Sequence, residues 1–175
     1  VVNFNLLNSI IFAGIIQGII FVALVASNTK YQNKTIFFLL SLIVIYILYS
    51  LQYYLHDIRF FTDIKAFYGT LYINWTLAMA PLGLWHGLSI MYPNKKITLI
   101  QKAHIIPFVL GLFIIMYYKL AFRFQVEYPF LDVVLDLIVV KADIFAIFHN
   151  LLVLGMLAYH INSYKNLDPY IRQWV

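Results

Sequence analysis

The chain has 175 residues, of which 63% are hydrophobic and only 11% are charged. A soluble domain carries about 25% charged residues, so this composition excludes an ordinary soluble protein and predicts an integral membrane protein. The absence of cysteine excludes disulfides, thiolate metal sites, iron–sulfur clusters and cysteine nucleophiles. We attribute the net charge of +5 to basic cytoplasmic loops rather than to nucleic-acid binding.

Five apolar segments predict an all-α, polytopic membrane helix bundle, since a helix needs about 20 apolar residues to cross a bilayer. The expected spans lie at about Leu6 to Ser27, Thr35 to Leu55, Thr70 to Tyr92 and His104 to Phe122, with a fifth that ends near Ile161. We expect residues 1–162 to form this bundle. Residues 163–175 are expected to begin a cytoplasmic linker helix, because Asp168 resembles an N-cap and Pro169 a first-turn proline.

The charged residues predict an orientation. With five spans, seven of the 12 Lys and Arg residues fall on one side, and six of the seven acidic residues fall on the other. An excess of Lys and Arg marks the cytoplasmic side. We therefore expect an outside N-terminus and a cytoplasmic C-terminus. Because a helix is expected to begin near Pro169, we also expect the chain to be a piece of a longer polypeptide.

Small residues at a spacing of four predict sites where helices pack closely. Gly14 and Gly18 form such a pair in the first span, and Gly83 and Gly87 form another in the third. The expectation is close packing within the bundle, with dimerisation as the alternative. Pro81 lacks a backbone amide, which predicts a helix kink around residues 77–81.

The loop "HDIRFFTDIKAFYG" contains four apolar residues at helix-like spacing, namely Phe60, Phe61, Ile64 and Phe67. This pattern predicts an amphipathic segment on the outer membrane surface. An interfacial connector is the expected role, and a lid over a ligand cavity is the alternative.

Polar groups within the spans are the candidate ligand-binding residues: Asn74, His86, Asp143, His149 and Asn150. Such groups are costly in hydrocarbon, so they usually face the protein interior or water and often serve function. If they face the protein interior, the deep members of this set are expected to converge with Gln17 on one cavity: Asn74, His86, His149 and Asn150. Snorkelling and one interhelical hydrogen bond worth about 1 kcal/mol are the alternative explanation.

The fifth span carries these groups on two faces. A helical stripe is predicted to hold Asp132, Asp136, Asp143 and Asn150, and His149 shares a second face with His160. Asp143 is expected near the outer mouth of the bundle.

Enzyme and cofactor chemistry have little support in the sequence. The zinc motif HExxH, the GxSxG nucleophile turn and the Gly-rich nucleotide motifs are missing. We expect no enzyme, no metal site and no cofactor. One b-type haem held by His86 and His149 is the alternative, in a subunit that handles haem or quinone.

Four stretches carry a resemblance to a known family. They are "GIIQGIIFVALVASNTKYQNKTIFFLLSLIVI", "APLGLWHGLSIMY" before a lysine-rich turn, "KAHIIPFVLGLF", and "LAYHINSYKN" leading into "IRQWV". Together they resemble the membrane-embedded N-terminal region of AraC-type transcription regulators common in Bacteroidetes. Ala80 departs from the family, which often has Gly there, and "LGLWHG" replaces a more aliphatic, tyrosine-rich version.

The resemblance implies a membrane sensor that relays a small-molecule or protein signal to a cytoplasmic DNA-binding domain outside this segment. The segment itself is expected to contact membrane lipid and no nucleic acid. A homodimer is also expected, because AraC-type regulators often bind DNA as dimers. In this interpretation the fifth span is the output element. The alternative is a small structural or accessory subunit of a larger membrane complex, whose polar groups only join helices.

Overall fold

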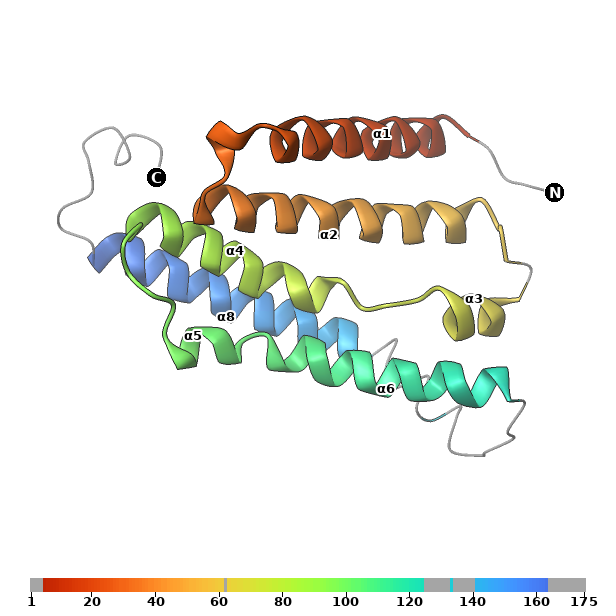
Figure 1. The fold of residues 1–175 in the computed structure, drawn as a ribbon. Helices are drawn as coiled ribbons and strands as arrows, with labels where there is room; N and C mark the ends of the chain where they lie inside the picture. The colour runs from red at the N-terminus through yellow and green to blue at the C-terminus, as the bar shows by residue number, and fades with distance from the viewer. Residues whose placement is uncertain (1–4, 62, 125–132, 134–140, 164–175) are drawn as a thin grey trace.

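The computed structural model describes residues 5–61, 63–124, 133 and 141–163, and every element in this part of the chain is helical (Figure 1). The elements in order are α1 (Leu6–Ser27), η1 (Thr29–Tyr31), α2 (Lys34–Asp57), α3 (Ile64–Thr70), α4 (Thr76–Met91), α5 (Leu99–Ala103), α6 (Ile106–Arg123) and α8 (Ala142–Ser163). The predicted linker helix over 164–175 lies outside the described residues, as do Asp132 and Asp136.

The described helices are those of a membrane protein, as the composition predicts. Four are long and apolar enough to cross a bilayer: Leu6–Ser27, Lys34–Asp57, Leu99–Arg123 and Ala142–Asn162. The third predicted span is shorter than expected. Its helix, α4, has 16 residues, and a helix of that length reaches about 24 Å against a hydrocarbon thickness of about 30 Å. The described chain therefore has four candidate spans where the sequence predicts five.

Side-chain caps fix where several helices begin. Asn5 accepts a hydrogen bond from the amide of Asn8 at the start of α1, and Asn33 caps α2 in the same way. Thr98 and Gln101 form a reciprocal capping box at the start of α5. Such caps satisfy amides that have no partner within the helix, which explains why these boundaries are sharp.

The third predicted span begins six residues late because its first part is not helical. Residues 71–75 connect α3 to α4, and the amide of Ile73 donates to Gln52 Oε1 of α2 at 2.8 Å instead of to a helical carbonyl. Pro81 lies inside α4. The interruption thus lies upstream of the position where the proline predicts a kink.

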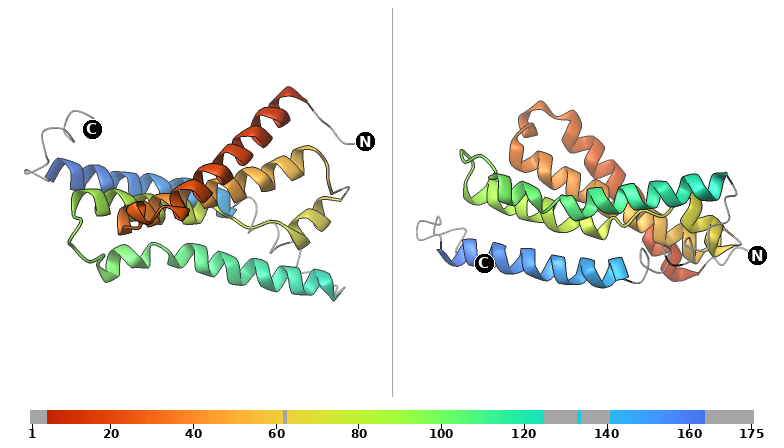
Figure 2. Two further views of the ribbon diagram at one scale, coloured as in Figure 1. Left: turned by 45° about the horizontal axis from the view of Figure 1, so that its top comes forward. Right: turned by 90° about the horizontal axis from the view of Figure 1, so that it is seen from below.

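α4 is the central helix of the bundle. It packs against α2 and α8, and it also contacts α5 and α6. Leu84, Leu88 and Met91 of α4 form a buried apolar cluster with Val153 of α8. Helix α1 packs on α2, and Figure 2 shows that it diverges from the direction of α4, α6 and α8.

A second buried cluster closes the end of the bundle where α3 lies. It contains Phe67 of α3, Tyr72 of the connector, and Ile115 and Tyr118 of α6. Phe67 is 4% exposed whereas Phe60 is 64% exposed. The loop predicted to be amphipathic therefore turns some aromatic side chains into the protein and others outward.

One glycine of each predicted pair makes a close helix contact. A Cβ atom at Gly87 would lie 2.6 Å from Leu157 Cδ1 of α8, and one at Gly18 would lie 2.9 Å from Ile47 Cγ1 of α2. At Gly14 and Gly83 a Cβ atom would meet nothing within 4 Å. Within this chain, Gly18 and Gly87 therefore make close helix contacts, whereas Gly14 and Gly83 do not.

Five described lysines lie at the end of the bundle opposite α3, on η1, at the start of α2, and around the turn from α4 to α5: Lys30, Lys34, Lys95, Lys96 and Lys102 (Figure 1). The Lys34 ammonium donates to the backbone carbonyl of Lys95 at 2.8 Å, which ties the start of α2 to this turn. We call this the lysine end. The other end of the bundle also carries described basic residues, at the ends of α2 and α6 and before α8: Arg59, Lys119, Arg123 and Lys141.

Candidate functional site

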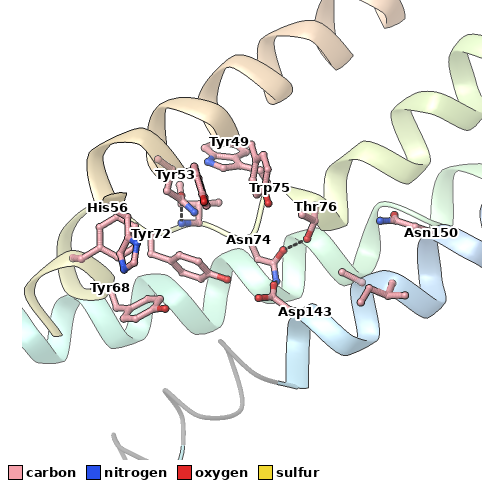
Figure 3. Close-up of a pocket in the computed structure, with 15 residues that line it drawn as sticks. Tyr49, Tyr53, His56, Tyr68, Tyr72, Asn74, Trp75, Thr76, Asp143 and Asn150 are labelled. Atoms are coloured by element: carbon pink, nitrogen blue, oxygen red, sulfur yellow. Dashed lines mark hydrogen bonds between the residues drawn. The ribbon is translucent and has the colours of Figure 1, made fainter. Parts of the chain in front are cut away.

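A pocket of about 470 Å³ lies at the end of the bundle opposite the lysine end (Figure 3). Its walls come from α2, from α3 and the connector that follows it, and from the first turns of α4 and α8. The described lining residues are Tyr49, Gln52, Tyr53, His56, Phe67, Tyr68, Tyr72, Ile73, Asn74, Trp75, Thr76, Asp143, Ala146, Ile147 and Asn150. The volume is typical of sites for small molecules, which range from about 300 to 1,000 Å³.

Helix α2 supplies one wall through a stripe of polar and aromatic residues. Tyr49, Gln52, Tyr53 and His56 follow one another at steps of three, one and three residues, so they lie on one helix face. Gln52 is 7% exposed and accepts from the Ile73 amide. This bond holds the connector against α2 and supplies a partner for an amide that is outside any helix.

Asp143 in the first turn of α8 is the centre of the polar network. Asn74 Nδ2 donates to its Oδ1 at 3.1 Å, and the Tyr72 hydroxyl also hydrogen-bonds to this carboxylate. Asn74 is 8% exposed and accepts at Oδ1 from the Thr76 hydroxyl. A carboxylate near a helix N-terminus is further stabilised by the helix dipole.

Both donors to Asp143 are neutral groups of the connector, the Tyr72 hydroxyl and the Asn74 amide. They therefore position the carboxylate without cancelling its charge.

Asn150 lies on the same face of α8 as Asp143, seven residues further along. Seven residues are almost two helical turns, or about 10 Å along the axis. The Oδ1 atom of Asn150 is buried and has no hydrogen-bond partner in the described part of the chain. A buried acceptor without a donor is unusual in a folded protein and indicates unmet binding capacity.

Two candidate histidines lie outside this pocket. His86 of α4 is half-buried, and its Nδ1 lies 3.1 Å from the backbone oxygen of Thr35 on α2. His149 of α8 is 9% exposed, and its ring lies 5.6 Å from the His104 ring and stacks on Phe145. Neither ring nitrogen of His149 has a hydrogen-bond partner among the described residues.

The structure corrects the expectation of one shared cavity. It brings Asn74, Asp143 and Asn150 together in the pocket and places His86 and His149 elsewhere. Gln17 is exposed on α1.

The alternative of a haem held by His86 and His149 does not fit the geometry. His86 faces α2, whereas His149 faces the junction of α5 and α6, so the two imidazoles do not face each other across one site. Two axial ligands must point at the same iron. Among the described residues, no three or more His, Cys, Asp or Glu side chains are placed to hold a metal ion.

Sequence reasoning missed most of the aromatic wall. The stripe of Tyr49, Gln52, Tyr53 and His56 in "YSLQYYLH" has the helical spacing that reveals a polar face, and this signal was readable. Tyr72 and Trp75 belong to a connector that the sequence presents as the start of a span, so no local pattern marks them as site residues.

No protein-family model, no curated protein and no solved structure matches this chain, so its candidate site is defined by geometry alone.

Proposed function

We propose that the chain is a membrane-embedded sensor module in which a small molecule binds the pocket and changes the pose of α8. One observation carries this proposal: the only formal charge among the described lining residues, Asp143, sits on the first turn of α8. A ligand that interacts with Asp143 acts directly on that helix. Helix α8 is 22 residues long. A rigid helix would carry a tilt or shift from its pocket end to its far end.

The lysine end supports a topology for this sensor. Basic residues concentrate on the cytoplasmic side of membrane proteins. Five described lysines share the lysine end, whereas Arg59, Lys119, Arg123 and Lys141 lie toward the pocket end. The proposed orientation therefore follows the distribution of seven against five Lys and Arg over the whole sequence. In the proposed orientation the pocket therefore opens toward the outside of a bacterial inner membrane and α8 ends in the cytoplasm. Helix α4 with its extended connector serves as the fifth crossing.

The output partner is proposed from the resemblance to AraC-type regulators. In this proposal α8 leads to a cytoplasmic DNA-binding domain, which makes the DNA contacts and favours a homodimer. Reading the coding sequence after Val175 tests this step. An encoded helix-turn-helix supports it, and a stop codon directly after Val175 contradicts it.

The relay itself is testable without knowing the ligand. Asp143→Asn removes the charge on α8 but keeps a side chain of the same shape, so we expect it to shift the lysine end of α8 by about 1–2 Å, the scale of allosteric helix shifts. The chain has no cysteine. Spin labels on Lys30→Cys and Tyr159→Cys, both at exposed positions, therefore report one distance by double electron–electron resonance.

The matched control is Asp57→Asn, which neutralises an aspartate at the pocket end of α2 that does not line the pocket. The label-to-label distance is expected to change with Asp143→Asn and to stay constant with Asp57→Asn. An unchanged distance in both variants would favour the structural subunit, whose polar groups only join helices.

A further inference from the structure

The pocket has aromatic walls. Six of its described lining residues are aromatic rings, contributed by α2, α3 and the connector: Tyr49, Tyr53, Phe67, Tyr68, Tyr72 and Trp75. The face of an aromatic ring carries negative electrostatic potential and attracts a cation within about 6 Å of its centroid. Rings that surround a cavity are the arrangement by which proteins recognise quaternary ammonium groups.

The pocket also carries the negative charge of Asp143. Its described lining residues include no Lys or Arg, and their one histidine is His56 of α2. The partners of Asp143, Asn74 and Tyr72, are neutral donors. A carboxylate offers about four lone-pair sites, so two donors leave it able to accept from a ligand as well.

A third feature is the unmet acceptor of Asn150, which lines the pocket seven residues along α8 from Asp143. Its buried Oδ1 has no partner in the described chain. A ligand with a hydroxyl or amine group beyond its cationic head would supply a donor at this position. Carboxylate, aromatic rings and amide therefore all favour a ligand that donates hydrogen bonds and carries positive charge.

We infer that the pocket binds a small organic ammonium ion, a protonated or quaternary amine, with Asp143 as its counter-ion and the tyrosine rings as its walls. The inference rests on the proposed function for the location of the ligand, but it does not depend on the relay through α8. The same ammonium chemistry occurs in free amines and in lipid headgroups. The lipid composition of the test separates these sources.

The test uses the full chain in nanodiscs of phosphatidylglycerol, which contains no ammonium group. Choline and its neutral carbon analogue 3,3-dimethyl-1-butanol are titrated by calorimetry, since the two differ mainly in charge. We expect choline to bind at least about 10-fold more tightly, as a cation–π and ion-pair contribution predicts. In Asp143→Asn this preference is expected to disappear, while circular dichroism shows the helical fold retained.

A matched pair of variants tests the walls. Tyr53 lines the pocket and is 48% exposed, so its replacement leaves the buried core intact. Tyr53→Phe keeps the ring face and is expected to keep the preference for choline, whereas Tyr53→Leu is expected to reduce it. Equal effects of the two variants would show that the ring face does not bind the cation.

The outcomes separate this inference from the proposed function. Equal binding of choline and the neutral analogue, or binding of neither, would contradict the inference that the ligand is an ammonium ion. The spin-label distance in Asp143→Asn would still test whether α8 moves. Tight choline binding with an unmoved α8 overturns the relay alone. If nanodiscs that contain phosphatidylethanolamine abolish choline binding, the occupant is a lipid headgroup, and unchanged binding there indicates a free amine.

Discussion

Gly87→Val is expected to lower the free energy of unfolding by about 2 kcal/mol, the usual cost of forcing extra carbons into a packed interface. Even a Cβ atom at this position would lie 2.6 Å from Leu157 Cδ1 and 3.3 Å from its Cδ2. Two further methyl groups would crowd Leu157 and strain this contact between α4 and α8. The measurement is unfolding by sodium dodecyl sulfate in mixed micelles, followed by circular dichroism.

The control is Gly83→Val, one helical turn earlier on α4, where a Cβ atom meets nothing within 4 Å. This variant is expected to leave stability within about 0.5 kcal/mol of the native chain. A similar loss in both variants would mean that valine disturbs α4 itself rather than its contact with α8. The contrast also matters for function, because α8 is the helix proposed to move against α4.

Leu84→Ala is expected to destabilise the chain by about 2–4 kcal/mol, because it deletes buried carbons and leaves a cavity. Leu84 is 1% exposed and belongs to the cluster that joins α4 to α8. Helix association in lipid depends on packing contacts rather than on exclusion of water, so lost contacts at this position are not replaced by lipid.

The same substitution at Leu154 serves as the comparison, since this leucine of α8 is 59% exposed. Leu154→Ala is expected to cost less than about 0.5 kcal/mol. Unfolding in the same detergent series measures both variants. Equal costs would contradict the assignment of the α4–α8 cluster as the core of the bundle.

Local signals in the sequence predicted one helix to the residue. The first span was predicted from Leu6 to Ser27 and α1 has these bounds, because both its apolar length and its Asn5 cap are encoded within the segment. The helical period also placed Asp143 and Asn150 on one face of the last span, and both line the pocket. Properties that depend on a single helix are readable without its neighbours.

Properties that depend on distant residues were not readable. The connector at 71–75 is not helical, and the amide of Ile73 within it donates to the side chain of Gln52 instead of to a helical carbonyl. Gln52 lies 21 residues away from Ile73 in the sequence. Asn74 finds Asp143 across 69 residues. His149 and Asn150 are neighbours in sequence, but consecutive residues on a helix point about 100° apart, so they face different parts of the protein.

The central claim is that Asn150 faces a water-accessible pocket which opens on the outside of the membrane, while the next residue on α8, Leu151, faces lipid. The most direct measurement is labelling of single-cysteine variants in intact spheroplasts with a cationic, membrane-impermeant methanethiosulfonate reagent. The chain has no cysteine of its own, so the background is clean. Thiols react as thiolates, which require water.

The account predicts labelling of Asn150→Cys from outside and no labelling of Leu151→Cys, whose side chain is 59% exposed and directed away from the pocket. Choline is expected to slow the reaction at Asn150→Cys. Equal labelling of the two variants, or labelling of Asn150→Cys only after the membrane is opened, would contradict a pocket that opens outward between α2, the connector and α8.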